Sequence, residues 1–173
     1  MTAIPEYSSS IPAGLVGFYR RIIKLPERIP LSLVQLASRI AVAHVFWQSA
    51  RTKLASWPVT LQLFANEYNL PFVEPAIAAP LATAAEITGS VLLFLGLLSR
   101  LGALVLLCVV SVIQIFVFPE NWAEHLLWVS LLLLVLTRGA GVISLDRLAD
   151  WAFTRKSLKS SSGREHTANV FRA

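Results

Sequence analysis

Two charged residues, Arg39 and Glu86, lie in stretches of sequence that are otherwise mostly apolar. A charged side chain at the centre of a bilayer costs about 2.5–3.5 kcal/mol on insertion scales, so such residues face a bundle interior and mark functional sites. If the two stretches cross a membrane in opposite directions, the charges lie at similar depths, because a helix rises by about 1.5 Å per residue. We therefore predict that Arg39 and Glu86 pair inside the protein, either to fix helix register or to serve binding or proton movement.

A second set of polar residues could contribute to the same site. His44, Gln48 and Arg51 fall at i, i+4 and i+7, on one face of a helix. His125 follows Glu124 at the start of another apolar stretch. A neutral histidine can pass protons or form a hydrogen bond with a quinone carbonyl. For His125 alone, a position facing lipid headgroups is the favoured interpretation.

Other reactive side chains have simpler interpretations. We expect Gln114 to form a hydrogen bond between helices rather than to bind a ligand. The single cysteine, Cys108, lies among apolar residues and is expected to be an inert packing residue. One cysteine also excludes an intrachain disulfide. The histidines and carboxylates lack the close spacing typical of a metal site, so no metal is predicted.

The elements that must position these residues are membrane helices. Of the 173 residues, 55% are hydrophobic and 14% are charged, whereas a soluble domain carries about a quarter charged residues. Very short turns separate the last three apolar stretches, which makes them sequential antiparallel neighbours. The sequence therefore predicts an all-α membrane protein, an antiparallel bundle of four transmembrane helices. The predicted spans are 31–49, 76–98, 101–118 and 122–137.

Two shorter helices are predicted outside the spans. Trp57, Leu61, Phe64 and Tyr68 fall on one face of an amphipathic helix that is too short to span, so we place it at the outer membrane surface. The alternative is a soluble loop helix packed on the bundle. Alternating apolar and basic residues predict a short interfacial helix at 18–25. The expected organisation is an N-terminal segment (1–30), a transmembrane domain (31–151) and a basic, disordered tail (152–173).

The distribution of basic residues indicates the orientation. With the N-terminus inside, only Arg51 and Lys53 lie in outer segments, and all the other Lys and Arg outside the spans are cytoplasmic. The positive-inside rule therefore places both termini in the cytoplasm. The net charge of +5 accompanies no recognition motif, so nucleic acid is not an expected partner. The expected partner is the lipid bilayer.

An ordered set of short elements resembles the DoxX family. The resemblance covers about residues 31–151. Its elements are Arg39 with Val45 and Phe46, Lys53, Phe64, Pro71, Ala85 with Glu86, Leu95-Gly96-Leu97 with Arg100, and Gly139-Ala140-Gly141 before Ser144-Leu145-Asp146. Lys53, with Gln114, forms a second tier of site candidates.

The resemblance implies a four-helix protein of the bacterial inner membrane. The family is similar to a subunit of a membrane thiosulfate:quinone oxidoreductase, and other members are tied to oxidative-stress complexes. The stretches 68–71 and 116–119 look similar to a subgroup found beside multinuclear iron oxidases that modify metal-binding peptides.

Two functions follow as hypotheses. The first is an accessory or quinone-linked subunit of a membrane redox or stress-response system, acting with other protein subunits. It would have no covalently bound cofactor, and quinone would be the candidate ligand of a polar site at Arg39, Glu86, His44, Gln48 and His125. The alternative is a non-catalytic membrane partner that anchors, assembles or helps to export a metal-stress or peptide-modification system. A carrier ranks lowest, because four helices without an internal repeat leave little room for alternating access.

Overall fold

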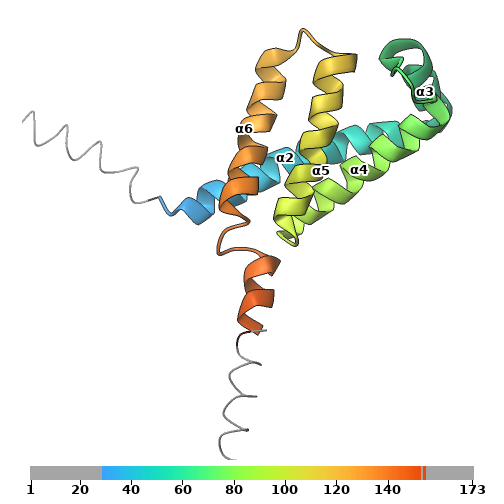
Figure 1. Cartoon of the computed structure of the whole chain (residues 1–173). Helices are drawn as coiled ribbons and strands as arrows, with labels where there is room; N and C mark the ends of the chain where they lie inside the picture. Colours follow the sequence, from blue (N-terminus) through green and yellow to red (C-terminus); the bar gives the residue numbers. More distant parts are fainter. Residues whose placement is uncertain (1–28, 153, 155–173) are drawn as a thin grey trace, which may run out of the picture. The chain divides into compact units, whose positions relative to one another are not determined.

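The computed structural model describes residues 29–152 and 154, and this part of the chain is helical (Figure 1). The helix predicted at 18–25, most of the predicted N-terminal segment and most of the predicted tail lie outside the described residues. The labelled elements are α2 (Leu31–Ala55), α3 (Trp57–Leu63), the π-helix η2 (Phe64–Tyr68), α4 (Pro75–Leu95), α5 (Ser99–Val112), the π-helix η3 (Ile113–Val117) and α6 (Trp122–Arg138).

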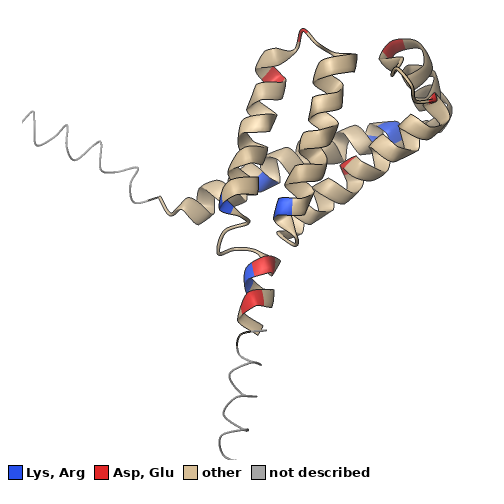
Figure 2. Ribbon diagram, viewed as in Figure 1, with Lys and Arg blue, Asp and Glu red and all other residues tan. Residues whose placement is uncertain are grey.

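Two of these helices are long and apolar enough to cross a bilayer: α4, and α5 continued by η3 over Ser99–Val117. They agree with the predicted spans to within a few residues. The middle parts of α5 and α6 carry no Lys, Arg, Asp or Glu, as Figure 2 shows. Large apolar side chains are exposed on α5, η3 and α6, for example Leu101, Ile115 and Leu127. Such exposed apolar helices are typical of a membrane protein.

The turn between α4 and α5 is built on a glycine. Gly96 adopts a left-handed conformation with φ of 68°. The amides of Gly96 and Leu97 donate to the carbonyls of Leu93 and Leu92, which ends the helix in the usual left-handed cap. A Cβ atom at position 96 would also collide with the guanidinium of Arg39. Both the backbone and the packing therefore require glycine here.

Helices α4, α5 and α6 pack as sequential neighbours, which confirms the prediction made from the short turns. Two glycines bring α4 and α5 close together. A Cβ atom at Gly89 would collide with the side chain of Leu106, and one at Gly102 would crowd Leu92. The buried core beside this contact includes Phe46, Leu93, Leu106, Val110 and Leu132.

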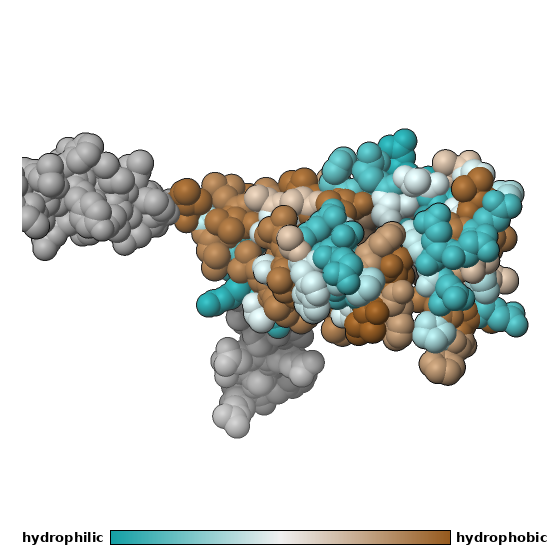
Figure 3. Space-filling model, turned by 90° about the horizontal axis from the view of Figure 1, so that it is seen from above, coloured by the Kyte–Doolittle hydropathy of each residue, from teal (hydrophilic) through white to brown (hydrophobic). Residues whose placement is uncertain are grey.

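The segment predicted to lie at the outer membrane surface forms α3 and η2. Its apolar stripe packs on α4: Phe64 is buried against Ala78 and Ala79, with Trp57 and Tyr68 beside it. Viewed toward the α5–α6 connection, the surface carries both hydrophilic and hydrophobic patches (Figure 3).

One predicted boundary is wrong: α2 continues to Ala55, six residues beyond the predicted end at Ser49.

Candidate functional site

The predicted pair of Arg39 and Glu86 is wrong, because Arg39 binds backbone carbonyls instead. Its Nε donates to the Leu93 carbonyl at 2.8 Å and its Nη2 to the Phe94 carbonyl at 3.2 Å. Its Nη1 donates to the carbonyls of Ala140 at 2.7 Å and Ile143 at 2.8 Å. The last carbonyls of a helix lack helical partners and carry its negative dipole end, so a guanidinium is well matched to them.

Two further side chains form hydrogen bonds at the same helix ends, those of α4, α5 and α6. Gln35, one turn before Arg39, donates from Nε2 to the carbonyls of Arg138 at 3.0 Å and Gly139 at 3.1 Å. The Asp146 carboxylate accepts from the backbone amides of Leu98 and Ser99, at the N-terminus of α5. We call Gln35, Arg39 and Asp146 the helix-end cluster. It ties the ends of α4, α5 and α6 together.

Glu86 has a different cation as its partner. The Lys53 ammonium lies 2.8 Å from Oε1 and 2.9 Å from Oε2 of Glu86. It also donates to Ser49 Oγ at 2.7 Å, and Ser49 in turn donates to Glu86 Oε1 at 3.2 Å. The exposed fractions of the two charged side chains are 9% for Lys53 and 1% for Glu86. We call Ser49, Lys53 and Glu86 the Lys–Glu cluster.

The position of Lys53 follows from the length of α2. Because the helix continues past Ser49, Lys53 falls one turn later on the same face and reaches α4. Thr60 of α3 supports this end by donating from its hydroxyl to the Lys53 carbonyl at 2.7 Å. The sequence analysis placed Lys53 in an outer segment and among the second-tier candidates, so it missed this pair.

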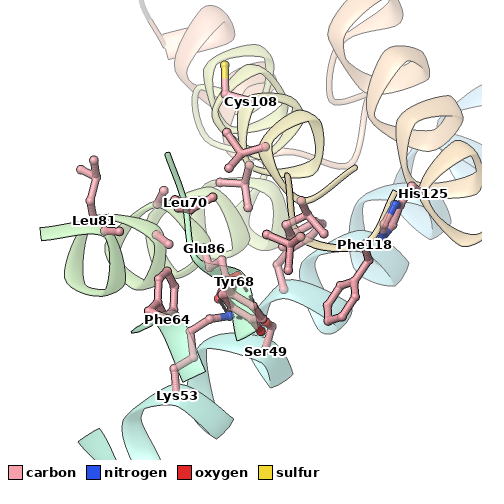
Figure 4. Close-up of a pocket in the computed structure, with 18 of the residues that line it drawn as sticks. Ser49, Lys53, Phe64, Tyr68, Leu70, Leu81, Glu86, Cys108, Phe118 and His125 are labelled. Carbon is pink, nitrogen blue, oxygen red and sulfur yellow. Dashed lines mark hydrogen bonds and ion pairs between the residues drawn. The ribbon is translucent and has the colours of Figure 1, made fainter. Parts of the chain in front are cut away.

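The Lys–Glu cluster lines a cavity of about 580 Å³. Figure 4 shows Ser49, Lys53, Glu86 and Tyr68 gathered on one side of the cavity, and His125 away from them. The walls are mostly apolar and come from α2, η2, α4, α5, η3 and α6. Apolar lining residues include Phe46, Phe64, Leu70, Ala82, Ala85, Val109, Ile113 and Trp128.

His125 lies in the cavity wall rather than facing lipid headgroups. Its side chain is buried, with 3% exposed. Its Nδ1 lies 2.6 Å from Oε1 of Gln114, and Gln114 donates from Nε2 to the Pro119 carbonyl at 2.7 Å. The hydrogen bond between η3 and α6 confirms the role predicted for Gln114. The favoured interpretation of His125 was wrong, because the side chain is buried and its Nδ1 is hydrogen-bonded to Gln114 on the neighbouring helix.

The remaining candidates lie elsewhere. His44 and Gln48 are exposed on α2. Gln48 accepts from Arg51 Nη1 at 3.1 Å, and His44 borders a separate cavity of about 360 Å³ between α2 and α4. Cys108 is exposed at the rim of the larger cavity rather than packed inside. Within the described residues, no three metal-binding side chains come together.

Tyr68 is a cavity residue that the sequence analysis placed only on the amphipathic stripe. Its ring packs edge-on against Phe64 at 4.8 Å and Phe118 at 5.9 Å between ring centroids. Burial raises the pKa of the Tyr68 phenol above its ordinary value, and the nearby charges of Glu86 and Glu67 raise it further. The phenol therefore stays protonated at neutral pH.

These features define an all-helical membrane protein with an apolar cavity and an internal ion pair. Residues 34–119 match the DoxX family model, and this match supports assignment of the chain to the DoxX family. The matched region contains Arg39, Lys53 and Glu86 and ends before α6. Comparison with curated proteins and with solved structures finds no match.

Proposed function

We propose that this protein binds a neutral, lipid-soluble ring compound of the quinone type in the large cavity, as a subunit of a membrane redox or stress-response system. The observation that carries the proposal is an apolar cavity of about 580 Å³ with the neutralised Lys–Glu cluster in its wall. Small-molecule sites are typically about 300–1,000 Å³, mostly apolar, and lined by a few placed polar groups. The cavity has this character.

The charges of the cavity favour an uncharged ligand. The three hydrogens of the Lys53 ammonium have acceptors in Ser49 and in both oxygens of Glu86. An anion entering the cavity would therefore meet an ammonium whose charge and hydrogens are already used, and it would lose its hydration. A neutral ring with a carbonyl or hydroxyl group has no such cost.

The cavity also has a side that opens between two apolar helices. Leu81 of α4 and Val112 of α5 line it, yet their exposed fractions are 67% and 40%. Cys108 on α5 is exposed at the same rim. Because both helices are candidate membrane spans, a ligand dissolved in the bilayer could enter here without crossing water.

The proposed topology has four spans, with α2 and α6 crossing the membrane as well. Helix α2 has 25 residues and α6 has 17, which correspond to about 37 Å and 25 Å at 1.5 Å per residue, against a hydrocarbon thickness of about 30 Å. The basic residues at the α4–α5 turn and after α6 then lie in the cytoplasm. Both termini are cytoplasmic in this proposal, and the membrane is the inner membrane of a bacterium.

A second candidate function is supported by the exposed polar stripe of α2. His44, Gln48 and Arg51 lie exposed on a helix that we propose to be in the membrane, where polar groups are costly unless another protein covers them. This favours a membrane partner that anchors, assembles or helps to export a metal-stress or peptide-modification system. Crosslinking from a photoreactive residue at Gln48 in cells would capture such a partner. The candidate loses its support if the residue crosslinks only to lipid.

Ligand binding is tested with the full chain in lipid nanodiscs. Trp128 lines the cavity, so a short-chain quinone should quench tryptophan fluorescence in a saturable way. The variant Ala85→Phe fills the cavity and should weaken binding at least tenfold. The matched control Ala84→Phe changes the adjacent residue, which is exposed and does not line the cavity, and it should bind normally. Absence of saturable quenching, or equal loss in both variants, would overturn the proposal.

A further inference from the structure

The contacts of Gln114 determine which nitrogen of His125 carries a hydrogen. The Pro119 carbonyl can only accept, so the amide NH₂ of Gln114 must face it at 2.7 Å. The Gln114 oxygen then faces His125 Nδ1 at 2.6 Å. Because that oxygen can only accept, Nδ1 must be the donor. In the neutral ring, Nε2 is consequently a hydrogen-bond acceptor.

The Nε2 atom of His125 has no partner among the residues that the structure describes. No hydrogen bond to it occurs among the described residues, although the side chain is only 3% exposed. In that part of the chain, the Ser99 hydroxyl is the only fully enclosed polar side-chain atom without a hydrogen bond, so Nε2 keeps contact with open space. The ring lines the large cavity, where Figure 4 shows it beside Phe118. We therefore expect a ligand in the cavity to reach this acceptor.

We infer that the cavity prefers the hydroxyl-bearing form of its ligand, a hydroquinone or a similar phenol, whose O–H donates to His125 Nε2. The inference rests on the proposed function and specifies its ligand. A quinone carbonyl has no hydrogen to donate, so its binding would leave Nε2 unpaired in an apolar wall. A site with an unpaired buried polar group discriminates strongly against the ligand that cannot satisfy it.

The other polar groups of the cavity do not create the opposite preference. Asn121 and Glu124 line the cavity from exposed positions; the Asn121 amide can donate or accept, and the Glu124 carboxylate can only accept. The hydroxyl of Tyr68 has no hydrogen bond among the described residues and can either donate or accept, so it can serve a carbonyl or a hydroxyl equally. The Lys53 hydrogens are already used within the Lys–Glu cluster. His125 is therefore the residue expected to determine which form binds.

The test compares three neutral probes that differ only at oxygen: a short-chain hydroquinone, its dimethyl ether and the matching quinone. Each is titrated anaerobically into the full chain in nanodiscs. We expect the hydroquinone to bind about tenfold more tightly than the other two, in line with one hydrogen bond to a partner that is otherwise unpaired. The variant His125→Leu should bring the three affinities together.

Two variants at Gln114 separate this role from a purely structural one. In Gln114→Leu the ring loses its fixed tautomer, so the preference for hydroquinone should shrink while quinone still binds. In Gln114→Glu a protonated carboxyl can donate to the Pro119 carbonyl and still accept from Nδ1, as the amide does, so the preference should remain at a pH that keeps this carboxyl protonated. If His125→Leu does not fold, the difference in hydroquinone preference between Gln114→Leu and Gln114→Glu tests the role of His125.

The possible failures are distinct. Binding of none of the probes would overturn the proposed function itself. Equal affinity of the native protein for hydroquinone and quinone, or an undiminished preference in both His125→Leu and Gln114→Leu, would overturn only the inference about His125.

Discussion

The same helix supplies two buried cations that are neutralised in different ways. In the helix-end cluster, Arg39 meets four backbone carbonyls and does not line the cavity of about 580 Å³. In the Lys–Glu cluster, Lys53 meets a carboxylate from α4 in the wall of the cavity. The comparison teaches that a buried charge need not have an opposite charge as its partner, and that the kind of partner indicates the role.

The helix-end cluster has the character of a structural joint. Its acceptors are the terminal carbonyls of α4 and those of the turn after α6, and Asp146 faces the terminal amides of α5. Each charge thus meets the helix end of opposite partial charge. Apart from the Leu93 carbonyl, which also accepts from the Gly96 amide, these backbone groups would otherwise lack partners in an apolar surrounding, where each is costly.

The largest expected effect in the comparison comes from removing Arg39. In Arg39→Ala the carbonyls of Phe94, Ala140 and Ile143 lose their donor, and that of Leu93 keeps only the Gly96 amide. Each group left unsatisfied costs about 1–3 kcal/mol, although the costs are not additive. We expect a protein that unfolds at much lower temperature in detergent or does not accumulate in the membrane. The exposed Arg100 provides the control: Arg100→Ala should change the melting temperature little.

Because Glu86 does not bind Arg39, the double variant Arg39→Ala with Glu86→Ala should not recover the loss. Recovery would mean that the two residues pair after all. Arg39→Lys should rescue only partly, since an ammonium has three donors and cannot match the fork of the guanidinium.

Breaking the Lys–Glu cluster should have the next largest effect. Lys53→Met leaves the Glu86 carboxylate buried without a cation, and breaking a buried pair typically costs about 3–5 kcal/mol. Chemical unfolding in detergent measures the loss. The double variant Lys53→Met with Glu86→Gln should recover most of it, and failure to recover would show that Lys53 stabilises the protein by other contacts.

Removing the cap on α5 should have a moderate effect. Asp146→Ala leaves the amides of Leu98 and Ser99 without a side-chain acceptor, and loss of such a cap typically costs about 0.5–2 kcal/mol. Asp146→Asn keeps an acceptor oxygen and should lose less. Equal unfolding midpoints for the native protein and Asp146→Ala would contradict the assigned cap.

The smallest effect concerns the phenol of Tyr68. Because burial, Glu86 and Glu67 raise its pKa, its phenolate should appear at higher pH than that of an ordinary tyrosine. The difference between ultraviolet absorbance titrations of the native protein and Tyr68→Phe isolates this group from the other tyrosines. A difference curve centred at or below the ordinary pKa of about 10 would show that Tyr68 is not enclosed as described.

The sequence was sufficient to predict α4, α5–η3 and α6, because long apolar runs separated by very short turns allow few arrangements. It was insufficient for Arg39, since backbone carbonyl acceptors leave no signature in residue types. The role of Lys53 was missed because the last turns of α2 are polar, so the helix was predicted to end before Lys53. The sequence also did not predict that His125 is buried. Its ring is held by a hydrogen bond to Gln114, and the spacing of these two residues does not indicate a contact until the turn between η3 and α6 is known.

The most direct test of the account is a pair of double-mutant cycles that share Glu86→Gln, measured as free energies of unfolding in detergent. The cycle with Lys53→Met should give a coupling energy of about 3 kcal/mol, the upper end of the range for groups in contact. The cycle with Arg39→Met should be additive within about 0.5 kcal/mol. Strong coupling between Arg39 and Glu86, with none between Lys53 and Glu86, would contradict the division of the buried charges into two clusters.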